Sequence, residues 1–307
     1  MARLAILLAG VPETDDDAVD SRSSRSGGGP PNSTNGPGTR VRGLAPSLRP
    51  HAAIGSRYSR AVPYLTAAAH DIQRIHRVRD EDLPDAAVLY GIWSSTTGEA
   101  EVRALFPEAR PAAERTVLVE RNGRRVWVVW CYGAAMASSH AHVAAVLGAR
   151  SIIQVGSYGG LATDGRVGDV LVPSRVIGRD GVSRQQSRGA PIEMNGSLRA
   201  ALASELEAGG ETVIDGLLLT TTSISLERDQ DVRRWVRAGY AGVEMEAAAT
   251  AAMARHFGVA TAGAFVLWDN IGVGHTIFTR TDEERARAKH AQVQIIRAAV
   301  EVASRSG

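Results

Sequence analysis

The sequence predicts an α/β fold: a single domain built on a central, mixed and twisted sheet flanked by helices. From residue 86 on, short apolar runs alternate with segments of helical length, a pattern typical of a sheet covered by helices. The chain has 307 residues, of which 44% are hydrophobic, so a sizeable core is expected. Glycines gather where the predicted strands end, and in an open α/β sheet ligands bind at such ends.

The first part of the chain differs in composition from the rest. Residues 1–43 are rich in Asp, Ser, Gly, Pro and Asn and carry few apolar side chains, which predicts a disordered or flexible extension. We expect the folded domain to span residues 44–307, with an amphipathic helix within residues 62–75 and a turn at residues 83–85. The apolar run at residues 4–9 is too short to cross a bilayer, so no membrane partner is expected.

Composition excludes several classes of protein. The 35 basic and 33 acidic residues give a net charge of +2, and aromatic residues make up 5% of the chain, so no nucleic-acid partner is expected. Cys131 is the only cysteine, which excludes an internal disulfide and makes the cytoplasm the default location. Lys289 is the only lysine, so there is no Gly-x-x-x-x-Gly-Lys phosphate loop. We expect no metal and no cofactor, because His140 and His142 diverge on the helix predicted to carry them.

The individual elements follow from local pattern. Apolar and β-branched runs between turn residues predict strands at residues 86–92, 116–120, 125–131, 151–155, 167–172, 212–220 and 261–268. The dipeptide Asn122-Gly123, between the second and third of these strands, is typical of a tight hairpin turn. Apolar residues at helical spacing predict helices at residues 136–147, 198–208, 230–238, 245–257 and 282–304.

A glycine-rich run follows the predicted strand 151–155. We expect Gly156-Ser157-Tyr158-Gly159-Gly160 to form a turn. The run is not Gly-x-Gly-x-x-Gly, and no acidic residue ends a strand about 20 residues later. A dinucleotide-dependent oxidoreductase is therefore only a distant alternative.

Acidic residues mark the ends of two predicted elements. Glu244 and Glu246 come at the start of the predicted helix 245–257, where the helix dipole favours negative charge. Residues two apart on a helix point to different sides, so at most one of the two carboxylates serves a given site. Asp269 directly follows the predicted strand 261–268. Two fixed carboxylates at neighbouring strand ends suit sugar hydroxyls and a leaving group that needs a proton, although helix or turn capping would also explain each acid.

Four segments, in this order, resemble the nucleoside phosphorylase and nucleosidase family. They are Val155-Gly156-Ser157-Tyr158-Gly159-Gly160-Leu161, Val167-Gly168-Asp169-Val170, Val243-Glu244-Met245-Glu246-Ala247-Ala248 and Trp268-Asp269-Asn270. The resemblance extends from about residue 75 to the C-terminus and is closest to the purine nucleoside phosphorylase and uridine phosphorylase branch. It implies a nucleoside phosphorylase-like fold, a small-molecule nucleoside as substrate and a homo-oligomer, either a dimer or a trimer of dimers.

The resemblance also implies a role for each matching residue. Glu246 would bind the ribose 2′- and 3′-hydroxyls, and Met245 would pack on the sugar. Asp269, paired with Arg285, would protonate N7 of a purine as the glycosidic bond breaks. His76 would reach the 5′-hydroxyl of a substrate in a neighbouring subunit. The remaining positions implied to contact the nucleophile, the sugar or the base are Gly156, Ser157, Thr222 and Ser223.

Two phosphate-binding positions of the phosphorylases differ in this chain. The family's Gly-Asp-Pro-x-Arg loop is here the loop that starts at Gly91, with Ile92 and Ser95 in place of the acid and the arginine. Gln154 stands where a second phosphate arginine is usual, and a neutral amide does not replace a charge-assisted fork to a dianion. Arg115, near the hairpin, would match a third arginine supplied across the dimer.

The missing arginines resemble the hydrolytic branch of the family, in which water replaces phosphate. Glu101 is similar to the glutamate that activates the water in nucleosidases, but a solvated helix start explains Glu99 and Glu101 at least as well. Trp268 stands where most relatives have Ser, which would change the base side of the pocket.

The sequence thus predicts an enzyme that cleaves, or in reverse forms, the N-glycosidic bond of a purine-like nucleoside. Pentosyl transfer to inorganic phosphate as co-substrate is the leading hypothesis. Hydrolysis by water is the close alternative, because phosphate-binding arginines are missing. A nucleoside-binding protein that has lost catalysis is the second alternative.

Overall fold

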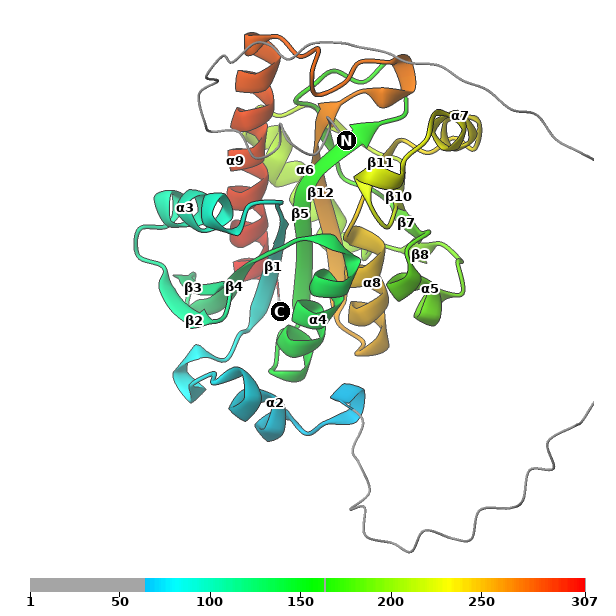
Figure 1. The fold of residues 1–307 in the computed structure, drawn as a ribbon. Coiled ribbons are helices and arrows are strands. Elements are labelled where there is room, and N and C mark those ends of the chain that lie inside the picture. Colours follow the sequence, from blue (N-terminus) through cyan, green and yellow to red (C-terminus); the bar gives the residue numbers. More distant parts are fainter. Residues whose placement is uncertain (1–63, 163, 307) are drawn as a thin grey trace, which may run out of the picture. The chain divides into compact units, whose positions relative to one another are not determined.

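A computed structural model of the protein describes residues 64–162 and 164–306 (Figure 1). The extension predicted at residues 1–43 lies outside the described residues, as does the start of the domain predicted from residue 44. Among the described helices, none is both long and apolar enough to cross a membrane.

The centre of the molecule is one mixed sheet of 12 strands. The strands are β1 (Ala86–Gly91), β2 (Arg110–Ala113), β3 (Thr116–Arg121), β4 (Arg124–Cys131), β5 (Ser151–Gly160), β6 (Val170–Leu171), β7 (Arg175–Gly178), β8 (Ile192–Glu193), β9 (Val213–Ile214), β10 (Leu217–Thr220), β11 (Gly242–Glu244) and β12 (Ala260–Asp269). They are ordered β2-β3-β4-β1-β5-β11-β10-β7-β8, with β12 beside β5 and β6, and β9 beside β6. Strands β4, β1, β5 and β12 are parallel neighbours, whereas β11 runs antiparallel to β5. The predicted mixed sheet is confirmed.

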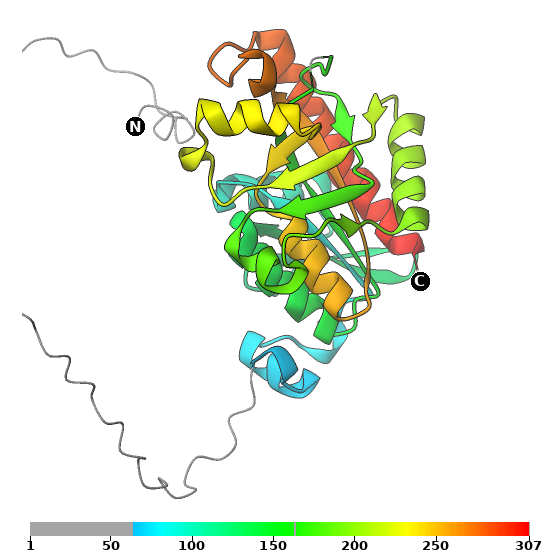
Figure 2. The ribbon, with the colours of Figure 1, turned by 90° about the vertical axis from the view of Figure 1, so that its right-hand side faces the viewer.

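Helices cover both faces of the sheet. They are α2 (Ala69–His76), α3 (Ser95–Leu105), α4 (Gly133–Val146), α5 (Gly181–Ser187), α6 (Gly196–Ala208), α7 (Asp229–Arg237), α8 (Ala247–His256) and α9 (Asp282–Arg305). Figures 1 and 2 show α9 and α6 on one face and α4 and α8 on the other. Side chains of β1 alternate between these layers, because Val88 belongs to the core under α9 and Leu89 to the core under α4.

Several predicted elements are confirmed by the structure. Strands β3 and β4 pair in an antiparallel hairpin, and both turn residues have positive φ, 52° at Asn122 and 70° at Gly123, as a tight primed turn requires. Helix α9 begins with a capping box between Thr281 and Glu284, which satisfies the first free N–H groups of the helix.

Other expectations were wrong in their boundaries. The glycine run at residues 156–160 is not a turn, because β5 continues through it to Gly160. The strand predicted at residues 212–220 is two strands, β9 and β10. The helix predicted within residues 62–75 starts only at Ala69, after a short 3-10 helix at Tyr64–Thr66. Sequence patterns also missed β2, β7, β8, β11 and α5, which are short and carry little periodicity.

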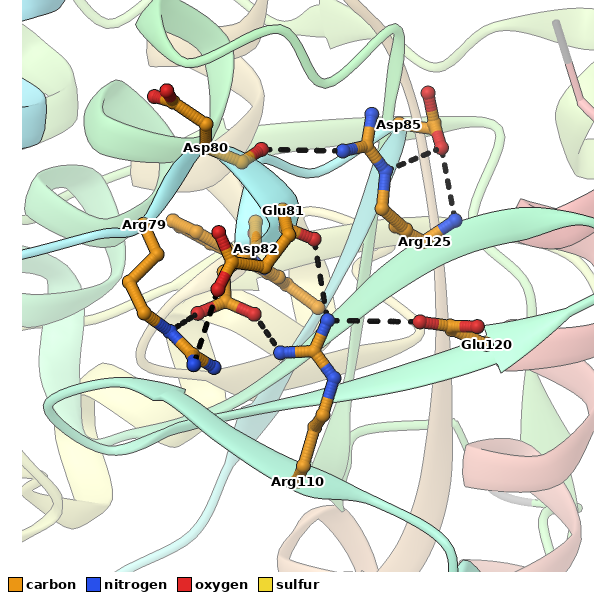
Figure 3. Close-up of polar contacts among 9 residues, drawn as sticks. Arg79, Asp80, Glu81, Asp82, Asp85, Arg110, Glu120 and Arg125 are labelled. Atoms are coloured by element: carbon orange, nitrogen blue, oxygen red, sulfur yellow. Dashed lines mark hydrogen bonds and ion pairs between the residues drawn. The ribbon is translucent and has the colours of Figure 1, made fainter.

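Ion pairs bind the segment before β1 to the neighbouring hairpin (Figure 3). Asp82 is only 1% exposed, accepts Arg79 Nε at 2.6 Å and also pairs with Arg110 of β2. Asp85 accepts the backbone N–H of Arg125 of β4 at 2.9 Å. Because a buried carboxylate such as that of Asp82 needs such partners, these contacts hold the segment before β1 against β2 and β4.

Candidate active site

The candidate site lies at the edge of the sheet where β1, β4, β5 and β12 end. These strands are parallel, so the segments that follow them meet at one edge (Figure 1). The loop after Gly91, the start of α4 at Gly133 and the carboxylate of Asp269 all follow such strand ends.

Glu246 is the buried acid nearest to these strand ends. Its Oε1 accepts the backbone N–H of Gly133 at 2.5 Å, and the residue is 7% exposed. A Cβ atom on Gly91 would lie 3.0 Å from Glu246 Oε2 and 3.4 Å from Gln154 Nε2. The side chains of Glu246 and Gln154 therefore both pack closely against the end of β1 at Gly91.

Glu244 has a different role from Glu246. It ends β11, and its Oε2 accepts the backbone N–H groups of Glu246 and Ala247, both at 2.7 Å. Its Oε1 accepts the hydroxyl of Thr220. Helix α8 starts at Ala247 and not at residue 245, so the two glutamates do not share a helix. Glu244 therefore caps the helix start, and Glu246 is the candidate acid of the site. The expectation that both glutamates lie on one helix was wrong.

Burial changes the acidity of both glutamates. It raises the pKa of Glu246 to about 7, although N–H groups of Gly133 and Met245 favour the ionised form. Burial, followed by the charge of Glu246, raises the pKa of Glu244 to about 8. Two neighbouring buried carboxyl groups resist simultaneous ionisation, so the pair holds protons close to neutral pH.

An aromatic pair that sequence reasoning missed lies beside Met245. The Tyr132 hydroxyl lies 3.8 Å from Met245 Sδ, and the Trp93 ring packs edge-on against Tyr132 with centroids 4.6 Å apart. Burial, followed by the charges of Glu246 and Glu227, raises the pKa of Tyr132. The available signal was position, because Trp93 and Tyr132 directly follow the strand ends of β1 and β4.

Three further predicted residues lie on β5. Gln154 is fully buried, and its Oε1 accepts the Thr250 hydroxyl at 2.7 Å. Gly156 passes so close to β1 that a Cβ would lie 3.3 Å from the Gly91 carbonyl oxygen. Ser157 is exposed. Gln154 and Gly156 therefore border the space at Gly91, where the arginine-containing phosphate loop of the phosphorylases would lie.

Asp269 ends β12 opposite Gly159 of β5. Its Oδ2 accepts the backbone N–H of Ile277 at 3.2 Å. Arg285, the expected partner of Asp269, binds the carboxylate of Asp282 and the carbonyl of Arg280. Burial lowers the pKa of Arg280, and the charge of Asp269 opposes that shift.

Thr222 and Ser223 follow β10. Thr220, two residues earlier, hydrogen-bonds Glu244, so this loop leaves the sheet close to the glutamate pair. Thr222 is exposed, and the Ser223 side chain accepts the backbone N–H of Ser225 at 3.3 Å.

Glu101 is not brought to Glu246. It accepts the Tyr90 hydroxyl at 2.6 Å and Gln292 Nε2 at 3.1 Å, and it pairs with Lys289. Tyr90 belongs to the core under α9, on the face of the sheet opposite to the one that Leu89 and Gly91 face. The comparison of Glu101 with a water-activating glutamate is therefore wrong for this arrangement, because three donors occupy its carboxylate.

His76 also lies away from Glu246 within one chain. Its Nε2 lies 2.6 Å from the Tyr64 hydroxyl, and it lines a cavity of about 190 Å³ together with Arg115 and His140. His140 lies two turns along α4 from Gly133, which binds Glu246. No group of three His, Cys, Asp or Glu side chains that could hold a metal occurs within residues 64–162 and 164–306.

Comparisons with known proteins identify the family. The sequence profile of the phosphorylase superfamily matches residues 95–303, and the chain belongs to this superfamily. No curated protein sequence matches the chain.

Among solved structures, the fold is similar to that of a purine nucleoside phosphorylase from Toxoplasma gondii in complex with immucillin-H. The TM-score is 0.64 at 20% sequence identity, and the match covers 75% of this chain and 95% of that chain. The family and the nucleoside phosphorylase-like fold expected from the sequence are thereby confirmed.

Proposed function

We propose that this protein cleaves the N-glycosidic bond of a purine nucleoside and transfers the pentosyl group to inorganic phosphate. The observation that carries the proposal is the position of Glu246, a buried carboxylate fixed by Gly133 and packed against Gly91 at the end of β1. A carboxylate accepts two hydroxyl groups at once, as the 2′- and 3′-hydroxyls of a ribose require. Membership of the phosphorylase superfamily supports phosphate as the acceptor.

Asp269 supplies the acid in this proposal. Phosphate oxygen attacks C1′ while the bond from C1′ to N9 breaks, and the bonding electron pair moves into the purine. Asp269 gives its proton to N7, so the base leaves neutral and pentose 1-phosphate forms. General acid catalysis of this kind contributes about 10²–10⁴-fold to a rate. The end of β12 next to Gly159 places this carboxyl group at the same sheet edge as the end of β1.

Hydrolysis is the second candidate, and the surroundings of Gly91 favour it. Neutral groups border this space: the Gln154 amide, which Thr250 holds, and the aromatic pair Trp93 and Tyr132. A phosphate dianion beside the buried Glu246 would need a cationic partner there, whereas water needs none. In that reaction water attacks C1′ and free pentose is released.

A panel of purine nucleosides, incubated with and without phosphate, tests the proposal. Phosphate-dependent release of base with pentose 1-phosphate as product supports phosphorolysis, and free pentose formed without phosphate identifies the hydrolase. The variant Asp269→Ala should lower kcat/KM by at least 100-fold for the best nucleoside. If the parent protein binds nucleosides without turning over any of them, the protein is a binding protein and the proposed reaction is refuted.

We also propose that the protein is a homo-oligomer whose neighbouring subunit completes the site. His76 and Arg115 line one cavity away from Glu246 of the same chain, an arrangement that supports their use across an interface.

A further inference from the structure

The guanidinium of Arg280 packs on the ring of Trp268, the residue before Asp269. Its guanidinium carbon is 4.6 Å from the centroid of the Trp268 ring, within the range of a cation–π contact. The pairing of β12 with β5 shifts register between Leu267 and Asp269, so Trp268 occupies a bulge. Bulges redirect side chains and recur next to active sites, and here the bulge presents the indole to Arg280.

Arg280 is also bound to the backbone that contacts Asp269. Its Nε donates to the Ile277 carbonyl at 3.5 Å, and the Ile277 N–H donates to Asp269 Oδ2 at 3.2 Å. The segment 271–281 between β12 and α9 is thus held at two points: Arg280 packs on Trp268, and Ile277 donates to Asp269.

The Arg280 guanidinium makes few polar contacts. Burial lowers the pKa of Arg280, the charge of Asp269 raises it, and Arg285 and Glu284 act on it with opposite signs. Its Nη1 is buried and has no hydrogen-bond partner within the described part of the chain. A half-buried guanidinium with an unpaired N–H interacts strongly with a nearby carboxylate, and Ile277, which Arg280 contacts, binds the carboxylate of Asp269.

Arg285 contacts the backbone of Arg280 and the side chain of Asp282. Its guanidinium donates to the Arg280 carbonyl and pairs with Asp282 at the start of α9. It therefore acts on Asp269 through Arg280, by holding the end of the segment 271–281.

We propose that Arg280, stacked on Trp268, is the positioning residue for Asp269. The inference rests on the proposed function, in which Asp269 transfers a proton to N7 and becomes a carboxylate. The guanidinium stabilises that carboxylate as it forms, and the segment that Arg280 holds keeps the Ile277 N–H on Asp269 Oδ2. Both effects are lost when no cation packs on Trp268, and the hydrogen bond to the Ile277 carbonyl also needs the guanidinium.

Kinetics of single and double variants test this role. Arg280→Met should lower kcat/KM by at least tenfold and move the alkaline limb of its pH profile to higher pH, because the ionised form of Asp269 loses its cation. Arg280→Lys should restore the limb but only part of the rate. In an Asp269→Asn background, Arg280→Met should change kcat/KM by less than twofold. Arg255→Met, an exposed arginine on α8, is the matched control that should leave the kinetics unchanged.

The same double-variant cycle measured by thermal unfolding needs no activity. At pH 7, Arg280→Met should shift the unfolding temperature of the parent more than that of Asp269→Asn. Additive effects in both cycles, or an unmoved pH limb, would overturn the role of Arg280. Full activity of Asp269→Asn would instead refute the proposed function of Asp269, whichever result Arg280→Met gives.

Discussion

The carboxylate of Glu244 accepts the backbone N–H of Glu246 at 2.7 Å. One acid thereby holds the backbone of the other at the start of α8, while Gly133 holds the side chain of Glu246 from α4. Glu246 is fixed from two directions, which suits a group that must meet two hydroxyls in a defined geometry.

The two glutamates should separate activity from stability. Glu246→Gln should lower kcat/KM for the best nucleoside by about 100-fold, because two hydrogen bonds to a charged acceptor weaken, and the unfolding temperature should change little. Glu244→Ala should lower the free energy of unfolding by about 2 kcal/mol, because α8 loses a cap. Steady-state kinetics and denaturant unfolding of both variants check this pairing, and the reverse distribution of effects would contradict it.

Stability should fall as the pH rises from about 4.5 towards 8. The pKa values of Glu246 and Glu244 are raised to about 7 and about 8 in the folded protein. In this pH range the folded state therefore binds more protons than the unfolded state. The free energy of unfolding falls as the two glutamates ionise. Thermal unfolding at half-unit pH steps measures the slope. The double variant Glu244→Gln, Glu246→Gln should flatten it, and an equal slope in the variant would assign the effect to other groups.

Gly91→Ala should damage the site without unfolding the protein. The Cβ of the alanine would lie 3.0 Å from Glu246 Oε2, so the carboxylate has to move. We expect the displaced carboxylate to lower kcat/KM by roughly tenfold to 100-fold. Gly196→Ala, at the first residue of α6 and with no atom within 4 Å of its Cβ, is the matched control. Equal activities of the two variants would place the substrate elsewhere.

Lys289→Met should destabilise the protein. Lys289 pairs with Glu101, whose side chain is 16% exposed, so its removal leaves a largely buried carboxylate with only neutral donors, at a cost of about 1–3 kcal/mol. Urea unfolding measures the loss. Lys289→Arg keeps the charge and should recover most of the stability, whereas an unchanged midpoint for Lys289→Met would show that the ion pair contributes nothing.

Mixed oligomers should recover activity if His76 serves a neighbouring subunit. His76→Ala and Glu246→Gln should each be weakly active alone. Subunits of the two variants, mixed and allowed to exchange, should regain activity in roughly a quarter of the sites, since one site of each mixed pair has both native residues. Assays before and after exchange, with sedimentation to establish the oligomer, measure this. No gain after proven exchange would place His76 outside the site.

Much of the candidate site could be predicted because it is encoded in contiguous residues. The Val-Glu-Met-Glu-Ala-Ala block at residues 243–248 leads into a helix as predicted, although α8 starts only at Ala247, and Asp269 lies at the end of β12. The pairing of Arg285 with Asp269 depended on the path of the segment 271–281, which has little periodicity. Similarly, Glu101 lies on the α9 side of the sheet because it binds Tyr90, and side chains alternate between the two faces along β1. The spacing of residues around Glu101 does not reveal which face of the sheet its partner occupies.

The longer strands and helices, the hairpin at Asn122-Gly123 and the family were determined by the sequence alone, because local periodicity, turn chemistry and short motifs act between near neighbours. The tertiary structure decided which glutamate caps α8, what the Arg285 side chain binds and what packs against Gly91. Those answers depend on contacts between residues far apart in the chain, such as Gly133 with Glu246 and Arg280 with Trp268. Only the packing of the sheet against its helices brings such residues together.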